Sequence, residues 1–475
     1  MASTFWMIFT RVLKGLLGLS ISKQTGKKYL QSKEKCLYIG IGKKLKDPEK
    51  QKTIIKIPDS HRKGHMWCFG TTRAGKTRSI EAMVEQDIRK NYSVVVIDPK
   101  CDIKLFSKIV QVAFEENRYE DLIFVTPIFP EYSAVIDPLA YYYMPEELVS
   151  HIISGVPVDD PFFYKVAFEI SMVLVQSLLI KAKAENRKHN FNINEIKDRM
   201  SKEDLAELLK EIEMIDLPEA KDVAKNLKKI VSSPQEYYSK ISTSLRVALM
   251  QLSSGNIGKI VGKADENRFI KRLEEGKRVI LVAHLGAMLT EDAAKVLGKV
   301  IVSMIKTFVG RVFLSGLQVD PPLAVYIDEA QNVLYYGIED LFAKAGGAGV
   351  WVHAFNQSVN QIFKEVGRDF GRSILDNANT KIFMRVPDID TAEYAAKHFG
   401  TIRRFSPAIS PDGSIINKDV EEPLVKPEQI LNLQPRRFYM MTYTGQYYGK
   451  TIDVDDTYIE IQFPKISAEE QVVGV

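Results

Sequence analysis

The sequence predicts an α/β protein whose mainly parallel sheet is interrupted by an all-α domain. Short apolar runs alternate with amphipathic stretches over residues 63–140, and the same alternation resumes over residues 276–475. Residues 141–275, between these two parts, show only helical periods. Alternating strands and helices favour parallel strands joined by right-handed crossovers. We therefore expect the two α/β parts to share one sheet.

Composition excludes several classes of protein. The 475 residues are 45% hydrophobic and 26% charged, which excludes a disordered or collagen-like chain. Three cysteines in so long a chain exclude a disulfide scaffold. Cys36, Cys68 and Cys101 show no metal-ligand spacing, so we expect buried apolar side chains rather than a metal site.

The net charge of +5 conceals a basic N-terminal arm, residues 1–62. Such an arm is typical of chains that bind nucleic acid or an anionic membrane surface, and a solvated arm is the alternative. Within it, Phe5–Leu19 is apolar apart from Arg11 and Lys14. This pattern fits a membrane-peripheral helix or a terminal helix packed on its own domain. No stretch of about 20 mostly apolar residues predicts a membrane span.

The first α/β part contains three expected strands. His65–Phe69 leads into a glycine-rich loop, and Ser93–Ile97 is a continuous apolar run typical of a strand buried on both faces. Leu122–Val125 is the third expected strand, and Ile103–Val112 is predicted to be the helix before it.

The middle part, residues 141–275, is predicted to be entirely helical. Phe168–Ile180 is a long apolar helix without turn signals, and Ser201 resembles the first residue of a capping box. Gln235–Leu252 follows as an amphipathic helix. A basic cluster in this part fits either a DNA contact or a solvated helix face: Lys181, Lys183, Arg187 and Lys188.

The second α/β part resumes the strand pattern. The expected strands are Arg278–Ala283, Leu323–Ile327, Val350–Ala354 and Lys381–Val386, followed by a terminal β pair, Phe438–Thr444 and Gln446–Ile452. Between them, Arg403-Arg404-Phe405 is a second basic segment that fits either a DNA contact or a solvated surface.

A phosphate-binding loop follows the first expected strand. Gly70–Thr77 (GTTRAGKT) satisfies the pattern GxxxxGK[ST] and lies between a strand and a helix, as this motif requires. Its glycines let backbone N–H groups turn toward phosphate oxygens at a helix N-terminus. The nucleotide-binding residues expected here are Gly70, Thr71, Thr72, Arg73, Ala74, Gly75, Lys76, Thr77 and Arg78. Lys76 would contact the β- and γ-phosphates of ATP, and Thr77 would bind Mg²⁺.

An acidic pair supplies the second half of a nucleotide site. Asp328 and Glu329 follow the apolar run Leu323–Ile327. Asp328 is placed to hold Mg²⁺, and Glu329 to polarise the attacking water as a general base. A kinase must keep water away from its phosphates, so the adjacent glutamate favours hydrolysis.

Two further residues are expected at the site because they end neighbouring strands. Gln357 emerges after Val350–Ala354 and could orient the water or sense the γ-phosphate, with a turn-capping role as the alternative. Arg385 is a charge in an otherwise apolar run, which is costly unless it is paired or presented at an interface. An arginine finger supplied to a neighbouring subunit would explain it, and an ion pair with Asp388 or Asp390 is the alternative.

At this point the chain resembles type IV coupling proteins of the TraG/TraD group, and most closely the TraD proteins of integrative conjugative elements. The resemblance rests on the segments GHMWCFGTTRAGKTRSIEAMVEQDIRKNYSVVVIDPKCD, VYIDEAQNVLYYGIEDLFAKAGGAGVWVHAFNQS and NANTKIFMRVPDIDTAEY. YYSKISTSLRVALMQLSSG and RVILVAHLGAMLTEDAAKVLGKVI also fit, so the resemblance covers Lys63 to Thr444. These proteins belong to the FtsK/HerA-like division of RecA-type motor ATPases.

The resemblance implies a RecA-like P-loop NTPase fold and a homo-hexameric ring driven by ATP. The all-α domain would lie on one face of the ring and meet DNA or relaxosome proteins. Such rings link a relaxase-bound DNA strand to a type IV secretion channel and pump it through. By match of motif, the resemblance assigns phosphate and Mg²⁺ contacts to Lys76 and Thr77, the Walker B pair to Asp328 and Glu329, a strand-end sensor to Gln357 and an arginine finger to Arg385.

Two departures from the family pattern bear on location and catalysis. Many members begin with two transmembrane helices, whereas this chain offers only Phe5–Leu19. We therefore expect it either to dock at the cytoplasmic face of the bacterial inner membrane or to rely on a separate membrane-anchor partner. Some members carry an arginine in the segment that matches Ala343–Gly349, where only Lys344 is basic here, which leaves Arg385 as the better finger. We expect no long C-terminal substrate-docking tail.

The function predicted from all these features is ATP-driven DNA translocation during conjugation. One alternative is an FtsK/HerA-type translocase that works outside conjugation. The other is a ring that binds ATP and docks substrates without pumping. Glu329 argues against the last alternative, because a pure binding module does not need a general base.

Overall fold

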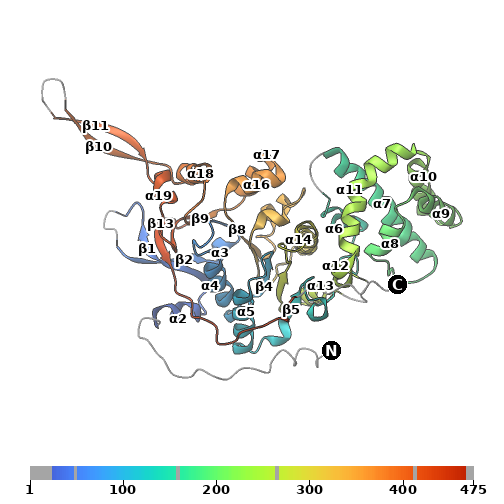
Figure 1. The fold of residues 1–475 in the computed structure, drawn as a ribbon, viewed down its shortest axis with the longest axis horizontal. Coiled ribbons are helices and arrows are strands. Elements are labelled where there is room, and N and C mark those ends of the chain that lie inside the picture. Colours follow the sequence, from blue (N-terminus) through green and yellow to red (C-terminus); the bar gives the residue numbers. More distant parts are fainter. Residues whose placement is uncertain (1–23, 48–50, 157–160, 263–266, 410–414, 467–475) are drawn as a thin grey trace.

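The structure is a computed structural model that describes residues 24–47, 51–156, 161–262, 267–409 and 415–466. In these residues a large sheet is covered by helices on both faces, a helical part lies on one side, and a two-stranded hairpin projects from the other (Figure 1). The expected helix at Phe5–Leu19 lies outside the described residues.

Eleven strands form the large sheet in the described residues. They are β1 (Cys36–Lys44), β2 (Thr53–Pro58), β3 (Met66–Phe69), β4 (Ser93–Asp98), β5 (Leu122–Val125), β6 (Ile280–His284), β7 (Leu323–Ile327), β8 (Val350–Asn356), β9 (Thr380–Phe383), β12 (Arg437–Thr442) and β13 (Gly445–Thr451). Their order across the sheet is β2-β1-β13-β12-β9-β3-β8-β7-β4-β6-β5.

The central part of this sheet is parallel. The strands from β9 to β5 all run parallel to their neighbours, whereas β12, β13, β1 and β2 continue the sheet in antiparallel pairs. Strands of the first α/β part are interleaved with strands of the second, since β3 lies between β9 and β8 and β4 lies between β7 and β6. The prediction of one mainly parallel sheet shared by both α/β parts is confirmed.

Helices cover both faces of the sheet. They are α4 (Lys76–Arg89) and α5 (Ile103–Glu115) on one face, and α14 (Glu291–Leu314), α15 (Glu339–Lys344), α16 (Val359–Val366), α17 (Arg368–Asp376) and α18 (Ile389–Phe399) on the other. Strand β4 supports both layers, because successive side chains of a strand point to opposite faces. Val94 and Val96 pack with α4 and α5, and Val95 and Ile97 pack on the opposite side.

The helical part is built from the middle of the chain, lies to one side of the sheet and packs against α14 (Figure 1). Its helices are α6 (Pro145–Ile153), α7 (Pro161–Ala184), α8 (Ile193–Asp198), α9 (Lys202–Glu213), α10 (Pro218–Ser232), α11 (Gln235–Ser253), α12 (Gly255–Ile260) and α13 (Arg268–Glu274). Ser201 caps α9 by accepting a hydrogen bond from the backbone N–H of Asp204. The domain boundaries drawn at residues 62, 140 and 275 stay predictions.

One helix in the described residues is long and apolar enough to cross a membrane, by length and composition only. It is Phe162–Ala184 within α7, and half of its most apolar stretch is buried inside the protein. Helices α6, α10 and α11 pack against it. A core helix of a soluble protein has the same length and composition, so this feature is weak support for a membrane span.

Part of the expected basic arm, residues 1–62, contains two strands that the sequence analysis did not predict. Strands β1 (Cys36–Lys44) and β2 (Thr53–Pro58) form an antiparallel pair that extends the large sheet through β13. The reason is local: Leu37, Ile39, Ile55 and Ile57 alternate with other residues and are all buried. The many lysines of this segment lower its mean hydropathy, although its apolar residues alternate as they do in a strand.

Two shorter predictions concern the C-terminal part. The terminal β pair is confirmed as β12 and β13, which pair antiparallel. The segment at Arg403 begins the projecting hairpin of β10 (Thr401–Ile409) and β11 (Ile415–Pro423). Arg403 and Arg404 are exposed there, and Arg403 lies opposite Glu421.

A buried histidine predicts how stability depends on pH. His151 of α6 is within 2.9 Å of the Ser303 hydroxyl of α14, and burial lowers the pKa of His151 to about 3. Below the ordinary histidine pKa of about 6.5, the unfolded chain binds a proton that the folded protein excludes, so stability falls as pH drops toward 3. We expect His151→Gln to shrink the loss of melting temperature between pH 7.5 and pH 5.

The matched control is Ser303→Ala, which removes the hydrogen-bond partner but keeps the titrating ring. This variant should melt at a lower temperature at every pH and keep the wild-type pH dependence. An unchanged pH dependence in His151→Gln would contradict the assignment.

Candidate nucleotide-binding site

The glycine-rich loop is held at the carboxyl end of β3 by its neighbours on both sides. The backbone N–H of Gly70 donates to the Asn356 carbonyl at 3.0 Å, and that of Thr71 donates to the Arg385 carbonyl at 2.7 Å. Gly75 has φ of +113°, and a Cβ there would lie 3.3 Å from the Arg436 side chain. Glycine is therefore required at the last turn before α4.

Helix α4 begins at Lys76, directly after this turn. The Lys76 side chain is only 6% exposed, and its Nζ donates to the Gly70 carbonyl. Burial lowers the pKa of Lys76, although the nearby carboxylates of Asp328 and Glu329 oppose this shift. Thr77 follows and is half-buried. A cation and a hydroxyl at the N-terminus of a helix form an anion-binding arrangement.

The remaining loop residues differ in orientation. Thr72 and Arg73 are exposed, whereas Ala74 is buried. The Arg78 side chain pairs with Glu81 at 2.6 Å and with Asp456 at 2.5 Å. The Arg78 guanidinium is therefore held by these two carboxylates at the surface of α4.

Strand β7 delivers the acidic pair to the same edge of the sheet. The backbone N–H of Asp328 donates to the Ile97 carbonyl of the neighbouring strand at 3.0 Å. Burial raises the pKa of Asp328 to about 6, helped by Glu329 and opposed by Lys100. Its Oδ1 is buried and has no hydrogen-bond partner in the described residues. Such an oxygen fits a metal ion or a metal-bound water, because carboxylates are preferred Mg²⁺ ligands.

Glu329 is held in place by three side chains. Its carboxylate accepts hydrogen bonds from Lys100 Nζ, from Gln331 Nε2 at 3.0 Å and from Gln357 Nε2 at 3.0 Å. Burial pushes the pKa of Glu329 upward, but these hydrogen bonds outweigh it and the pKa is lowered. Its backbone is left-handed, with φ of 46°, a strained conformation for a residue with a side chain.

Gln357 lies where the sequence placed it, next to the acidic pair. Asn356, at the end of β8, donates to the Gln331 side chain at 2.6 Å. Gln331 in turn donates to Glu329, so the carboxylate is fixed by a chain of amides from two directions. Asn356 and Gln331 were not predicted, because neither lies in a recognisable motif.

Lys100 is a further site residue that the sequence analysis did not predict. It follows β4, and its Nζ pairs with Glu329 and lies 3.6 Å from Asp328 Oδ2. The available signal was the segment Asp98-Pro99-Lys100, which ends a buried strand. Because the two strands are neighbours in a parallel sheet, their carboxyl ends meet and bring the lysine to the acidic pair.

Arg385 is placed differently from the sequence prediction. Strand β9 ends at Phe383, so Arg385 follows the strand, and its side chain is exposed. In the described residues no ion pair joins it to Asp388, which caps α18, or to Asp390. The buried charge in this strand is Lys381, which donates to the Ala378 carbonyl. Solvent reaches the guanidinium, so the ion-pair alternative has no support in the described residues, and the arginine-finger role stays a prediction.

The basic cluster of the helical part is largely neutralised. Lys181 pairs with Glu211 at 2.8 Å, and Lys183 pairs with Glu219 at 2.8 Å. Arg187 pairs with Glu185 in the same way.

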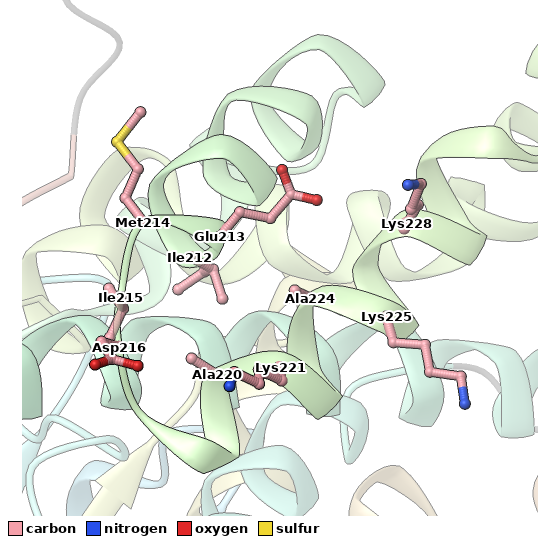
Figure 2. A pocket seen from close by; sticks show the side chains of 10 residues that line it. All are labelled: Ile212, Glu213, Met214, Ile215, Asp216, Ala220, Lys221, Ala224, Lys225 and Lys228. Carbon is pink, nitrogen blue, oxygen red and sulfur yellow. The ribbon is translucent and has the colours of Figure 1, made fainter.

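A different set of lysines lines a groove of 430 Å³ between α9 and α10 (Figure 2). Lys221, Lys225 and Lys228 are exposed there, and within the described part of the chain none of them forms an ion pair. The groove also contains Glu213 and Asp216, and it lies far from the glycine-rich loop.

Comparison with known proteins gives one family match. A family model described as the TraM recognition site of TraD and TraG matches residues 322–435, the segment from β7 to just before β12. No curated protein matches the chain.

Several solved structures share the fold. The bacterial conjugative coupling protein TrwBdeltaN70, in its unbound monoclinic form, has a TM-score of 0.63 at 16% identity, covering 95% of each chain. TrwB in complex with ADP and Mg²⁺ has a TM-score of 0.61 at 16% identity, covering 84% of this chain and 87% of that one. VirB4 of Thermoanaerobacter pseudethanolicus has a TM-score of 0.51 at 11% identity, covering 88% of this chain and 96% of that one.

These matches confirm the predicted RecA-like P-loop NTPase fold with a mainly parallel sheet and a helical insertion. The fold of TrwB, together with the TraD and TraG match over residues 322–435, confirms the resemblance of this chain to type IV coupling proteins of the TraG/TraD group.

Proposed function

We propose that this chain is an ATP-driven DNA translocase that couples relaxase-bound DNA to a type IV secretion channel during conjugative transfer. One observation carries the proposal: Lys76 of the glycine-rich loop and an ionised Glu329 share one edge of the sheet. The TraD and TraG match over residues 322–435 and the TrwB fold support the link to conjugation.

The chemistry follows from the positions of the side chains. Lys76 and the loop amides would bind the ATP phosphates, and Thr77 and Asp328 would hold Mg²⁺, an ion present in one TrwB structure. Mg²⁺, when bound, neutralises charge that develops on the phosphates. Glu329 would accept a proton from the attacking water, since its low pKa keeps it ionised. Gln357 and Gln331 orient that carboxylate.

The wider assembly is part of the same proposal. The chain would act as a homo-hexamer at the cytoplasmic face of the bacterial inner membrane, docked peripherally or through a membrane-anchor partner. Arg385 remains our candidate for the arginine finger, because it is exposed and its backbone contacts the glycine-rich loop. DNA, relaxase and channel components would be its partners.

Genetics and ATPase assays distinguish this proposal from a translocase that works outside conjugation and from a ring that docks substrates without pumping. Deleting the gene should abolish DNA transfer and leave cell division normal, whereas a division defect would favour a translocase outside conjugation. DNA should stimulate ATP hydrolysis by the purified protein. ATP binding without stimulation would favour a docking ring.

Two substitutions test the hydrolytic site. Lys76→Ala should abolish ATP turnover by removing the phosphate contact. Glu329→Gln should retain MgATP binding and lose about 10²–10⁴-fold in turnover, the usual contribution of a general base. The control Glu291→Gln makes the same chemical change at an exposed position of α14. Full turnover in Glu329→Gln would refute the general-base role.

The contact between Lys100 and Glu329 predicts a shift in the pH profile of kcat when Lys100 is removed. A nearby cation lowers carboxyl pKa values, typically by one to three units. Removing the lysine in Lys100→Ala should raise the pKa of Glu329 and move the acidic limb of the kcat profile to higher pH. Lys104→Ala, at an exposed lysine of α5, should leave the profile unchanged. An identical profile in both variants would contradict the role of Lys100.

The groove lysines predict where the helical part meets DNA. Replacing Lys221, Lys225 and Lys228 by alanine should weaken DNA binding and flatten its salt dependence, with a slope change of about 0.7–0.9 per lost phosphate contact. The control replaces Lys181 and Lys183, whose charges are already paired. An equal effect of both sets would place the contact elsewhere.

A further inference from the structure

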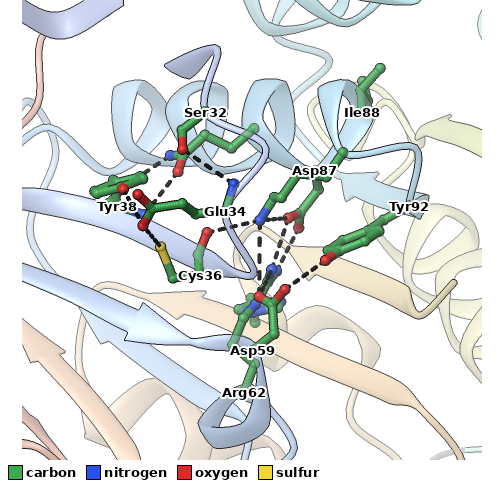
Figure 3. Close-up of polar contacts among 12 residues, drawn as sticks. Ser32, Glu34, Cys36, Tyr38, Asp59, Arg62, Asp87, Ile88 and Tyr92 are labelled. Carbon is green, nitrogen blue, oxygen red and sulfur yellow. Dashed lines mark hydrogen bonds and ion pairs between the residues drawn. The ribbon is translucent and has the colours of Figure 1, made fainter. Parts of the chain in front are cut away.

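A buried ion pair joins α3 (Asp59–Arg62) to the far end of α4 (Figure 3). Arg62 forms a bidentate ion pair with Asp87. Its Nη1 donates to Oδ1 at 2.8 Å, and its Nη2 donates to Oδ2 at 2.5 Å. Both side chains are almost completely buried. Two parallel hydrogen bonds of this kind fix direction as well as distance.

Tyr326 of β7 completes this cluster. Its hydroxyl donates to Asp87 Oδ2 at 2.5 Å, and Arg62 Nη2 donates to the same hydroxyl at 3.2 Å. Tyr326 precedes Asp328 by only two residues. The cluster therefore connects the helix that begins at Lys76 with the strand that ends at the acidic pair.

The surroundings leave the cluster little room to rearrange. The Arg62 guanidinium lies 4.4 Å from the Trp351 ring centroid, and Arg62 Nε donates to His353 Nε2 at 3.3 Å. Burial would raise the pKa of Asp87, but Arg62 outweighs it and holds that pKa well below its ordinary value. The carboxylate is therefore ionised and accepts both donors at neutral pH.

Directional hydrogen bonds add to the apolar packing between α4 and β7. Hydrophobic contacts are non-directional, so they define the position of a helix along its axis less sharply than a hydrogen bond does. The hydrogen bond from Tyr326 to Asp87 is directional and resists a shift of α4 along its axis. Because α4 is a single helix of 14 residues, a shift at Asp87 moves Lys76 by the same amount.

We propose that Tyr326 is a positioning residue for ATP hydrolysis: its hydroxyl, through Asp87, sets the separation between Lys76 and the Asp328–Glu329 pair. The inference rests on the proposed ATPase function. In this role the buried Tyr326, two residues before Asp328, aligns the two halves of the site without contacting the nucleotide.

Tyr92 provides a matched control within the same cluster (Figure 3). Its hydroxyl donates to Asp59 Oδ2 at 2.6 Å, and its side chain is buried. Tyr92 lies in the loop after α4 and is not part of β7. Tyr92→Phe therefore removes a similar hydrogen bond without releasing the strand that carries Asp328.

The experiment compares Tyr326→Phe and Tyr92→Phe with wild type. It measures kcat and KM at a temperature well below the unfolding transition, and it measures the melting temperature of each protein separately. Both substitutions keep the ring, so both variants should fold and lose similar amounts of thermal stability. Tyr326→Phe should lower kcat about tenfold, since small misplacements of catalytic groups cost up to about 10²-fold. Its KM for ATP should stay within about twofold, and Tyr92→Phe should keep wild-type kcat.

The outcomes distinguish this inference from the proposed function. Unchanged kcat in Tyr326→Phe, or equal losses of kcat in both variants, would overturn the positioning role while wild-type hydrolysis upheld the function. Absence of hydrolysis by wild type would overturn both.

Discussion

The in-register parallel pairing of β3, β8, β7 and β4 is the constraint on which the site depends. Ile97 pairs with Ile327, and Ile327 pairs with Ala354, so these strands end at nearly the same level. The glycine-rich loop, Lys100, the acidic pair and Gln357 all follow directly from strand ends. A slip of one residue would send side chains to the opposite face and separate these groups.

Charge balance stabilises this buried edge of the sheet. Two lysines, Lys76 and Lys100, oppose two carboxylates, Asp328 and Glu329. Uncompensated buried charges would be strongly destabilising. A phosphate bound at the N-terminus of α4 would replace the contact of Lys76 to the Gly70 carbonyl, because both compete for the same ammonium group. Helix α4 joins this edge to the Arg62–Asp87 pair at its other end.

Much of the fold was predictable because its signals are local. Strand β7 and strand β5 have the bounds that the sequence predicted, since a short apolar run between turns suffices to identify a buried strand. Two strand features differ from what the sequence predicted. The lysines of residues 1–62 concealed β1 and β2, and the apolar neighbours of Arg385 concealed the end of β9 at Phe383.

The sequence by itself determined the nucleotide motifs, because each consists of adjacent residues whose spacing is fixed by the backbone: Gly70–Thr77 and Asp328-Glu329. Only the tertiary structure decided which distant side chains complete them. Lys100 is 229 residues from Glu329 along the chain, and Tyr326 is 239 residues from Asp87. Contacts over such separations depend on strand order and on which side chains are buried together, and neither is encoded in a local pattern.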